Sequence, residues 1–128
     1  MVQKVTNDVN IVVETFYQEA HSNPIQSEYL FAYRITIENL GSVPVKLLRR
    51  YWHIVDSNGE MREVEGDGVV GQQPVIEPNH QYQYVSSCNL NSDIGKMSGM
   101  YTMLDLFTNK EIQVLIPEFL LIAPFKEN

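Results

Sequence analysis

Apolar side chains alternate with polar ones along most of this chain, as they do in a β-strand that buries one face. The clearest example runs from Tyr29 to Asn39, where every second side chain is aromatic or aliphatic up to Ile37. The same alternation predicts further strands at 9–17, 61–65, 82–88, 100–106 and 111–116, a long strand that starts at 47, and an apolar closing segment at 119–125. No window shows a sustained helical period, so we expect an all-β protein.

Short strands separated by turn residues are typical of an antiparallel β-sandwich of the immunoglobulin or fibronectin type III kind. We therefore predict one such domain over residues 1–128, with a small closed barrel as the alternative architecture. The polar stretch 18–27 and the glycine-broken stretch 89–99 predict loops. Pro117 is expected to interrupt the chain before the closing segment.

The stretch from Leu47 to Gly71 lies at the centre of this architecture. Asn58-Gly59 separates two runs rich in apolar residues and predicts a hairpin with a type I′ turn, which needs positive φ at both central residues. Alternation before the turn predicts two faces, with Leu48, Trp52 and Ile54 on one and Leu47, Arg49, Tyr51 and His53 on the other. Arg50 interrupts the apolar face, so we expect it near an edge or with its guanidinium in solvent.

Composition restricts the class of protein further. The net charge of −7 argues against binding to nucleic acid, because phosphate backbones repel an acidic surface. Cys88 is the only cysteine and cannot form an intrachain disulfide. The N-terminus lacks the apolar core of a signal peptide, and no apolar run approaches the roughly 18 residues of a membrane helix. We expect a cytoplasmic protein without membrane insertion.

Gly66, Gly68 and Gly71 match the G-x-G-x-x-G pattern of dinucleotide-binding loops. Such a site needs a helix directly after the glycines, and the prolines at 74 and 78 prevent one. The glycines are therefore expected to bend a β-rich chain. Successive amides in the same loop can also bind an anion without a helix, and this alternative stays open.

Other candidate chemistry in the chain is sparse. Glu63, Glu65 and Asp67 could suit a hard cation such as Mg²⁺, but we favour a solvated strand face. The histidines and the cysteine lack the close spacing of a zinc site, and no G-x-S-x-G motif is present. We predict no catalytic residue, no metal ligand and no cofactor.

Arg49, Tyr51 and His53 form an outward-facing row on the predicted long strand. Arginine and tyrosine are enriched at interface hot spots, so this row is a candidate partner-binding surface. The alternative is an ordinary solvent face that carries mixed polar and aromatic residues. Exposed edge strands of a sandwich can also pair between copies, so we expect that a homodimer can form.

Several motifs resemble those of the bacterial ApaG family across nearly the whole chain. They are LRRYWHI at 48–54, VEGDGVVGQQP at 64–74, IEP at 76–78 and GMY at 99–101. The resemblance implies an immunoglobulin- or fibronectin-like sandwich, a link to Co²⁺ resistance and Mg²⁺ efflux, and a protein-binding role. It also implies a link to nucleotide polyphosphates and a pyrophosphate site at Gly66, Gly68 and Gly71.

Together these features predict a non-enzymatic ApaG-type binding domain. We expect its partner to be an unidentified protein, in a process connected with divalent-cation homeostasis. The alternative is a regulator that binds a nucleotide or pyrophosphate through the glycine loop, with or without a divalent metal.

Overall fold

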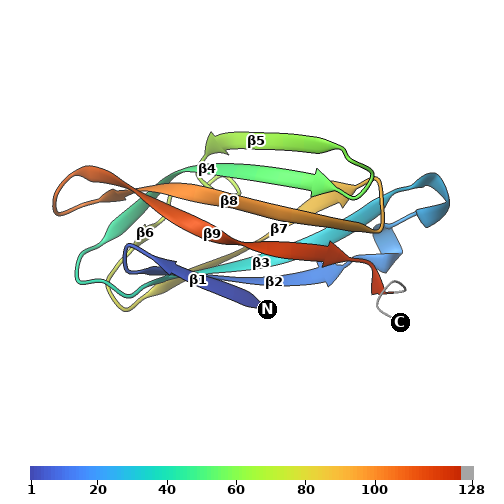
Figure 1. The fold of residues 1–128 in the computed structure, drawn as a ribbon. Helices are drawn as coiled ribbons and strands as arrows, with labels where there is room; N and C mark the ends of the chain where they lie inside the picture. The colour runs from blue at the N-terminus through green and yellow to red at the C-terminus, as the bar shows by residue number, and fades with distance from the viewer. Residues whose placement is uncertain (125–128) are drawn as a thin grey trace.

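A computed structural model describes residues 1–124 and shows two antiparallel β-sheets packed face to face (Figure 1). The strands are β1 (Val2–Thr6), β2 (Val9–Tyr17), β3 (Tyr29–Asn39), β4 (Val45–Asp56), β5 (Met61–Asp67), β6 (Val75–Ile76), β7 (Gln81–Leu90), β8 (Ile94–Asp105) and β9 (Lys110–Ile122). One sheet has the order β1-β2-β3-β7, and the other has the order β5-β4-β8-β9 with β6 also paired to β4. The predicted sandwich is confirmed, and the closed barrel is not formed.

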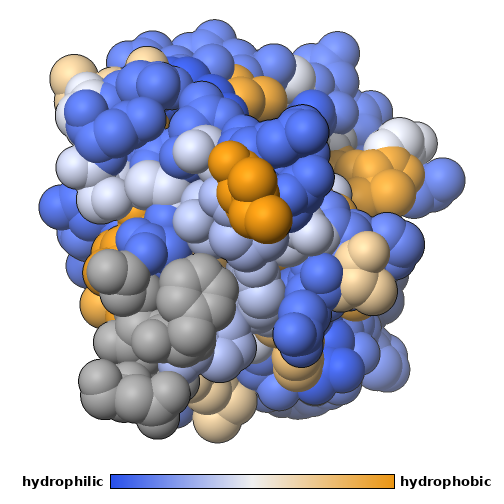
Figure 2. All heavy atoms as spheres, turned by 90° about the vertical axis from the view of Figure 1, so that its right-hand side faces the viewer, coloured by the Kyte–Doolittle hydropathy of each residue, from blue (hydrophilic) through white to orange (hydrophobic). Residues whose placement is uncertain are grey.

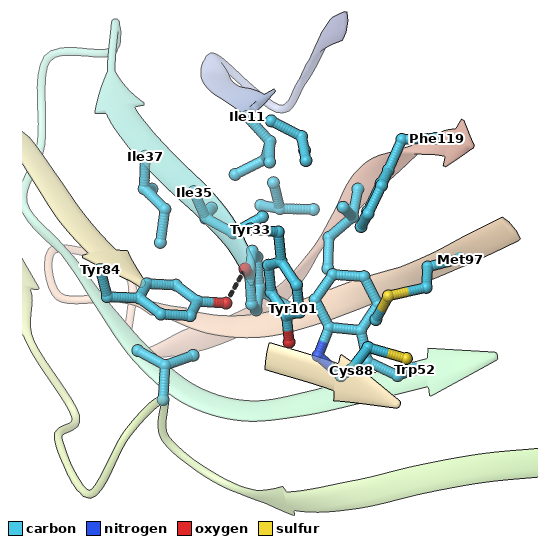
Figure 3. Close-up of a cluster of buried hydrophobic side chains, with 14 of the residues drawn as sticks. Ile11, Tyr33, Ile35, Ile37, Trp52, Tyr84, Cys88, Met97, Tyr101 and Phe119 are labelled. Carbon is cyan, nitrogen blue, oxygen red and sulfur yellow. Dashed lines mark hydrogen bonds between the residues drawn. The ribbon is translucent and has the colours of Figure 1, made fainter. Parts of the chain in front are cut away.

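Buried side chains of both sheets fill the space between them. Tyr33, Trp52 and Phe119 form an aromatic group whose ring centroids lie 5.5 to 5.9 Å apart. Beside this group, the hydroxyls of Tyr84 and Tyr101 meet across the two sheets at 2.5 Å (Figure 3). The single tryptophan therefore lies in the core, on a central strand as expected.

The strand bounds differ from the sequence prediction at β1 and at the start of β8. The N-terminal strand β1 was not predicted, and the expected loop at 89–99 is wrong because β8 already begins at Ile94. Gly95 and Gly99 suggest a loop, yet both lie inside the strand. A Cβ at Gly95 would lie 2.8 Å from the backbone oxygen of Val55, so glycine is needed here for close packing of strands.

Pro117 does not end the last strand, since β9 continues from Lys110 to Ile122. The β8–β9 register shifts between Met97 and Gly99, which places a bulge opposite the proline. Because β9 is an edge strand, it tolerates the missing amide hydrogen. The predicted closing segment is thus a strand up to Ile122, and its last residue, Phe125, lies outside the described residues.

The hairpin between β4 and β5 is confirmed, but its turn type is not. Of the two central residues, only Gly59 has positive φ, at 93°. The Gly59 amide donates to the Asp56 oxygen at 3.0 Å, and the Asp56 amide donates to the Glu60 oxygen at 2.8 Å. This is a three-residue loop with glycine in the left-handed position. The Asn58 side-chain oxygen accepts a hydrogen bond from the Glu60 amide at 2.9 Å, and this bond stabilises the loop.

A β-bulge between Leu47 and Arg49 changes which side chains of β4 point inward. Leu47 is fully buried and Leu48 only partly, which is the reverse of the prediction. Beyond the bulge, Arg50 shares the inner face with Trp52 and Ile54. Arg49, Tyr51 and His53 lie on the outer face, as predicted.

No helix in the described chain is long and apolar enough to cross a membrane. Figure 2 shows the end of the sandwich on the right-hand side of Figure 1, where polar side chains dominate and apolar ones are scattered. This end therefore has no broad apolar patch in view.

Candidate functional site

The outer face of β4 carries the predicted partner-binding row. Arg49 lies opposite Asp67 of β5 and Thr102 of β8, and Tyr51 lies opposite Glu65 and Met100. Arg49 and Tyr51 both line an open hollow of about 550 Å³ on this face. His53 lies two positions further along the strand, outside the hollow. The structure thus brings two of the three predicted residues into one depression.

Polar and charged side chains on this face lie in two parallel lines. Arg49 and His53 lie on β4, and the three carboxylates of β5 lie beside them on the same side, at Glu63, Glu65 and Asp67. The Arg49 guanidinium is 2.7 Å from Glu111 of β9, and both side chains are half-exposed. Such an exposed ion pair contributes little to stability, so Arg49 can exchange it for a partner.

Tyr51 lies between Arg49 and His53 on β4 and opposite Glu65 on β5. Burial raises the pKa of the Tyr51 hydroxyl, and the neighbouring carboxylate of Glu63 raises it further. The carboxylates themselves do not converge. In the part of the chain that the structure describes, no group of three or more His, Cys, Asp or Glu residues could hold a metal ion. The face therefore carries one ion-paired arginine, a histidine and a line of carboxylates around an aromatic ring.

The glycine motif is not followed by a helix. Val70 and Gly71, with φ of 47° and 76°, form a two-residue turn closed by hydrogen bonds between Val69 and Gln72 of 2.8 and 2.9 Å. Pro74 and the short strand β6 come next. Gly68 and Gly71 thus bend a β-chain as predicted, Gly66 does not, and no dinucleotide-binding helix follows the motif.

Amide groups of the same loop are directed at protein carbonyls. Gly68 donates to Leu48 at 2.9 Å, while Val69 and Gln72 donate to each other. These amides are therefore not arranged as a nest for an anion. Gly66 differs from the other two glycines, because it lies within β5 and has no positive φ.

Behind the outer face, a cleft of about 500 Å³ opens between the two sheets. Arg50 and Arg62 both line it, together with the core residues Trp52 and Met97. Sequence reasoning placed Arg50 at an edge or in solvent and did not consider Arg62. The available signal was Gly66, which the register places directly opposite Arg50.

The polar groups of the cleft come mainly from β7. Ser86, Ser87 and Cys88 line its wall, and burial raises the pKa of the Tyr33 hydroxyl, an effect that the nearby Ser86 opposes. Burial raises the pKa of the Cys88 thiol, an effect that the nearby Arg62 opposes. Among the described residues that line the cleft there is no histidine and no carboxylate. The cleft therefore contains nucleophile types without a base beside them.

The protein-family model described as the ApaG domain matches residues 19–105, more than half of the chain. This chain belongs to the ApaG family. It is 41% identical to Protein ApaG of Sinorhizobium fredii over 124 residues, which cover 97% of this chain and 95% of that protein. It is 44% identical to Protein ApaG of Pectobacterium atrosepticum over 116 residues, covering 91% of this chain and 92% of the relative.

Solved structures agree with this assignment. The ApaA protein from Bordetella pertussis superposes with a TM-score of 0.88 at 39% identity, covering 91% of this chain and 94% of that one. A protein from Archaeoglobus fulgidus reaches a TM-score of 0.52 at 11% identity over 88% of this chain and 95% of its own. This second likeness shows the fold alone, whereas the first extends to the family.

Proposed function

We propose that this ApaG-family domain is a non-enzymatic protein-interaction module connected with Co²⁺ and Mg²⁺ homeostasis. Its partner binds the outer face of β4 through Arg49, Tyr51 and His53. The observation that supports this proposal is the hollow of about 550 Å³ that Arg49 and Tyr51 line on the outer face of the sheet. Arginine and tyrosine in such a depression are the typical anchors of a protein interface.

The charge pattern supports a protein partner over a simple ion. Arg49 on β4 and the carboxylates on β5 lie side by side, so a complementary surface needs both signs of charge in register. A single metal ion or phosphate would satisfy only one of the two lines. We expect binding to weaken as salt is raised, because exposed charges are screened over about 8–10 Å.

Separation of the candidate catalytic groups supports a non-enzymatic role. His53 lies on the outer face of β4, whereas Ser86 and Cys88 line the cleft on the other side of the same sheet. A histidine must lie within about 3 Å of a hydroxyl or thiol to activate it as a nucleophile. The sheet keeps these groups apart.

Affinity capture with the full chain tests the surface. In the variant Arg49→Ala/Tyr51→Ala, we expect partners of the wild type to be lost or to bind at least about tenfold more weakly. The matched control is Phe16→Ala/Arg34→Ala, which removes an arginine and an aromatic ring from the other sheet. Arg34 is likewise ion-paired, at 2.8 Å from Glu14, and stacks over Phe16. Identical partner sets for all three proteins would remove this face from the proposal.

The connection with divalent cations is supported by the family resemblance and needs its own test. A strain that lacks the gene is supplied with each variant and grown on a series of Co²⁺ concentrations. We expect the wild type and the control variant to restore growth, and Arg49→Ala/Tyr51→Ala to fail. Equal growth of the deletion strain and the wild type on Co²⁺ would contradict the connection.

A further inference from the structure

The two sheets of the sandwich leave an opening on one side. There β5 is the last strand of one sheet and β7 is the last strand of the other, and they are not paired with each other (Figure 1). The inner side chains of β5 and β7 form the walls of the cleft of about 500 Å³, and β4 forms part of its floor. Ligand pockets have volumes of about 300–1,000 Å³, so a small organic molecule fits this space.

Positive charge is concentrated in this cleft although the chain as a whole is acidic. Arg50 points inward because it shares its face with the fully buried Tyr101, directly opposite in the register. Its Nη1 donates to the backbone oxygens of Asp67 and Gly68, both at 3.0 Å. Arg62 donates to the Asn89 oxygen and to Cys88 Sγ. Within residues 1–124, neither guanidinium is paired with a carboxylate.

Gly66 provides a second and independent observation. Its φ is not positive, so the backbone at this position does not require glycine. A Cβ there would lie 2.9 to 3.0 Å from three atoms of the Arg50 guanidinium. The absent side chain therefore leaves the space in which the guanidinium lies. The first glycine of the motif thus accommodates an arginine, while Gly68 and Gly71 shape the turn.

The other residues that line the cleft determine which part of a ligand can lie beside its anionic group. Trp52 and Met97 supply an apolar floor, and Val64 supplies an apolar wall on β5. Ser86, on the inward face of β7, adds a hydroxyl. A guanidinium binds planar oxyanions through parallel hydrogen bonds, and carboxylates or phosphates are its usual ligands. An apolar floor beside it favours a ligand that also has an apolar body.

From this geometry we propose that the inter-sheet cleft is a binding site for a small organic anion. The oxyanion head lies at Arg50, and the apolar body lies against Trp52 and Val64. Arg50 also lines the outer hollow, but Trp52 and Val64 do not, and Arg49 and Tyr51 do not line the cleft. The two proposals therefore use different side chains and are tested independently. A phosphate monoester and a carboxylate share the required chemistry, and the experiment distinguishes between them.

The test is a titration of the full-length, isotope-labelled chain followed by amide NMR shifts and by the fluorescence of the single tryptophan. The probes are phenyl phosphate and phenylacetate. Inorganic phosphate, which lacks the apolar part, and benzyl alcohol, which lacks the anionic group, are the fragment controls. We expect saturable shifts at Val64, Ser86 and Ser87 with phenyl phosphate, phenylacetate or both below about 10 mM, and at least about tenfold weaker binding of the two fragments. The tighter of the two anions identifies the head group.

Neighbouring arginines provide the matched variants. Arg50→Gln removes the inward charge, and we expect at least about tenfold weaker binding, as for loss of a charged hydrogen bond. Arg49→Gln removes the same charge from the outer face and is expected to leave the affinity unchanged. Gly66→Ala displaces the guanidinium without removing it, and Val64→Trp fills the cleft. Both variants should weaken binding of the anion. They test the proposal even if Arg50→Gln does not fold.

Four results would overturn the proposal. These are no saturable shift at about 10 mM of either anion, equal affinity for benzyl alcohol, equal losses in Arg49→Gln and Arg50→Gln, and shifts confined to the turn at Gly68–Gln72. The capture experiment on Arg49→Ala/Tyr51→Ala uses a different surface. Its failure would leave the cleft unaffected, and failure of the titration would leave the outer face unaffected.

Discussion

The hydrogen bond between Tyr84 and Tyr101 joins the two sheets, and its removal has a calculable effect. Tyr101 is completely buried and Tyr84 is 8% exposed, with their hydroxyls 2.5 Å apart. The two residues come from β7 and β8, which belong to different sheets (Figure 3). Replacing either tyrosine with phenylalanine keeps the ring and leaves the other hydroxyl buried without this partner.

The size of the effect depends on whether one or both hydroxyls are removed. A buried polar group that loses its partner costs about 1–3 kcal/mol, so we expect Tyr84→Phe and Tyr101→Phe each to destabilise the fold by about 2 kcal/mol. The double variant leaves no orphaned hydroxyl and should cost about 1 kcal/mol or less. The two changes should therefore be non-additive by about 3 kcal/mol.

Urea unfolding followed by tryptophan fluorescence measures all four proteins of this cycle. Tyr82→Phe is the control, because it removes a hydroxyl from a partly buried ring on the same strand, and we expect a change within about 0.5 kcal/mol. If the double variant is destabilised by the sum of the single variants, to within about 0.5 kcal/mol, the two hydroxyls are not coupled and the reasoning is refuted.

Further predictions concern pH, the loop and its ligands. Burial raises the pKa of Tyr84 and Tyr101, so above the unfolded-state value of about 10 the unfolded chain loses protons that the folded chain keeps. Stability measured by urea unfolding should fall there by about 1.4 kcal/mol per pH unit for each tyrosine, and the double phenylalanine variant should show a flatter decline. Gly68→Ala should destabilise by at least about 1–3 kcal/mol in the same assay, because φ is 64° and a Cβ would collide with the Gln72 oxygen. Val70→Asn should raise the melting temperature by a few degrees, since an exposed β-branched residue at φ of 47° is strained; an unchanged value would contradict that strain. Calorimetry with pyrophosphate and Mg²⁺ should detect no binding at the glycine loop, whose amides at 68, 69 and 72 donate to carbonyls, and heat that Gly71→Ala abolishes would contradict this.

Local pattern was sufficient for most of the strands. β2 and β3 have the predicted ends because their alternation is unbroken and loop residues follow them directly. The incorrect strand predictions occur at a glycine and a proline whose presence is explained by contacts with another strand. The glycine at position 95 looks like a strand breaker, but it is required by the close approach of the Val55 oxygen on the neighbouring strand. Likewise, Pro117 fits within β9 only because that strand is at an edge opposite a bulge.

The candidate sites divide in the same way. The outward row of Arg49, Tyr51 and His53 follows from spacing along one strand, and its orientation is confirmed. Spacing also places Arg50 on the face of Trp52 and Ile54, but it does not show that the guanidinium lies in the cleft beside Gly66. The facing of Leu47 and Leu48 does not follow from spacing. Pairing of β4 with β8 introduces a bulge next to Leu47. The inserted residue reverses the side of the sheet on which side chains before the bulge lie, relative to those after it.

By itself, the sequence determined that this chain is a β-sandwich, where most of its strands lie, and that no helix can follow its glycine motif. These properties depend on side-chain alternation and on proline and glycine, which act over a few residues. Tertiary structure decided which strands are neighbours, where the strand register shifts, and that the Arg50 guanidinium lies in the cleft. Those properties depend on contacts between residues far apart in the chain, such as Arg50 with Gly66 and Tyr84 with Tyr101, which exist only after the two sheets have packed.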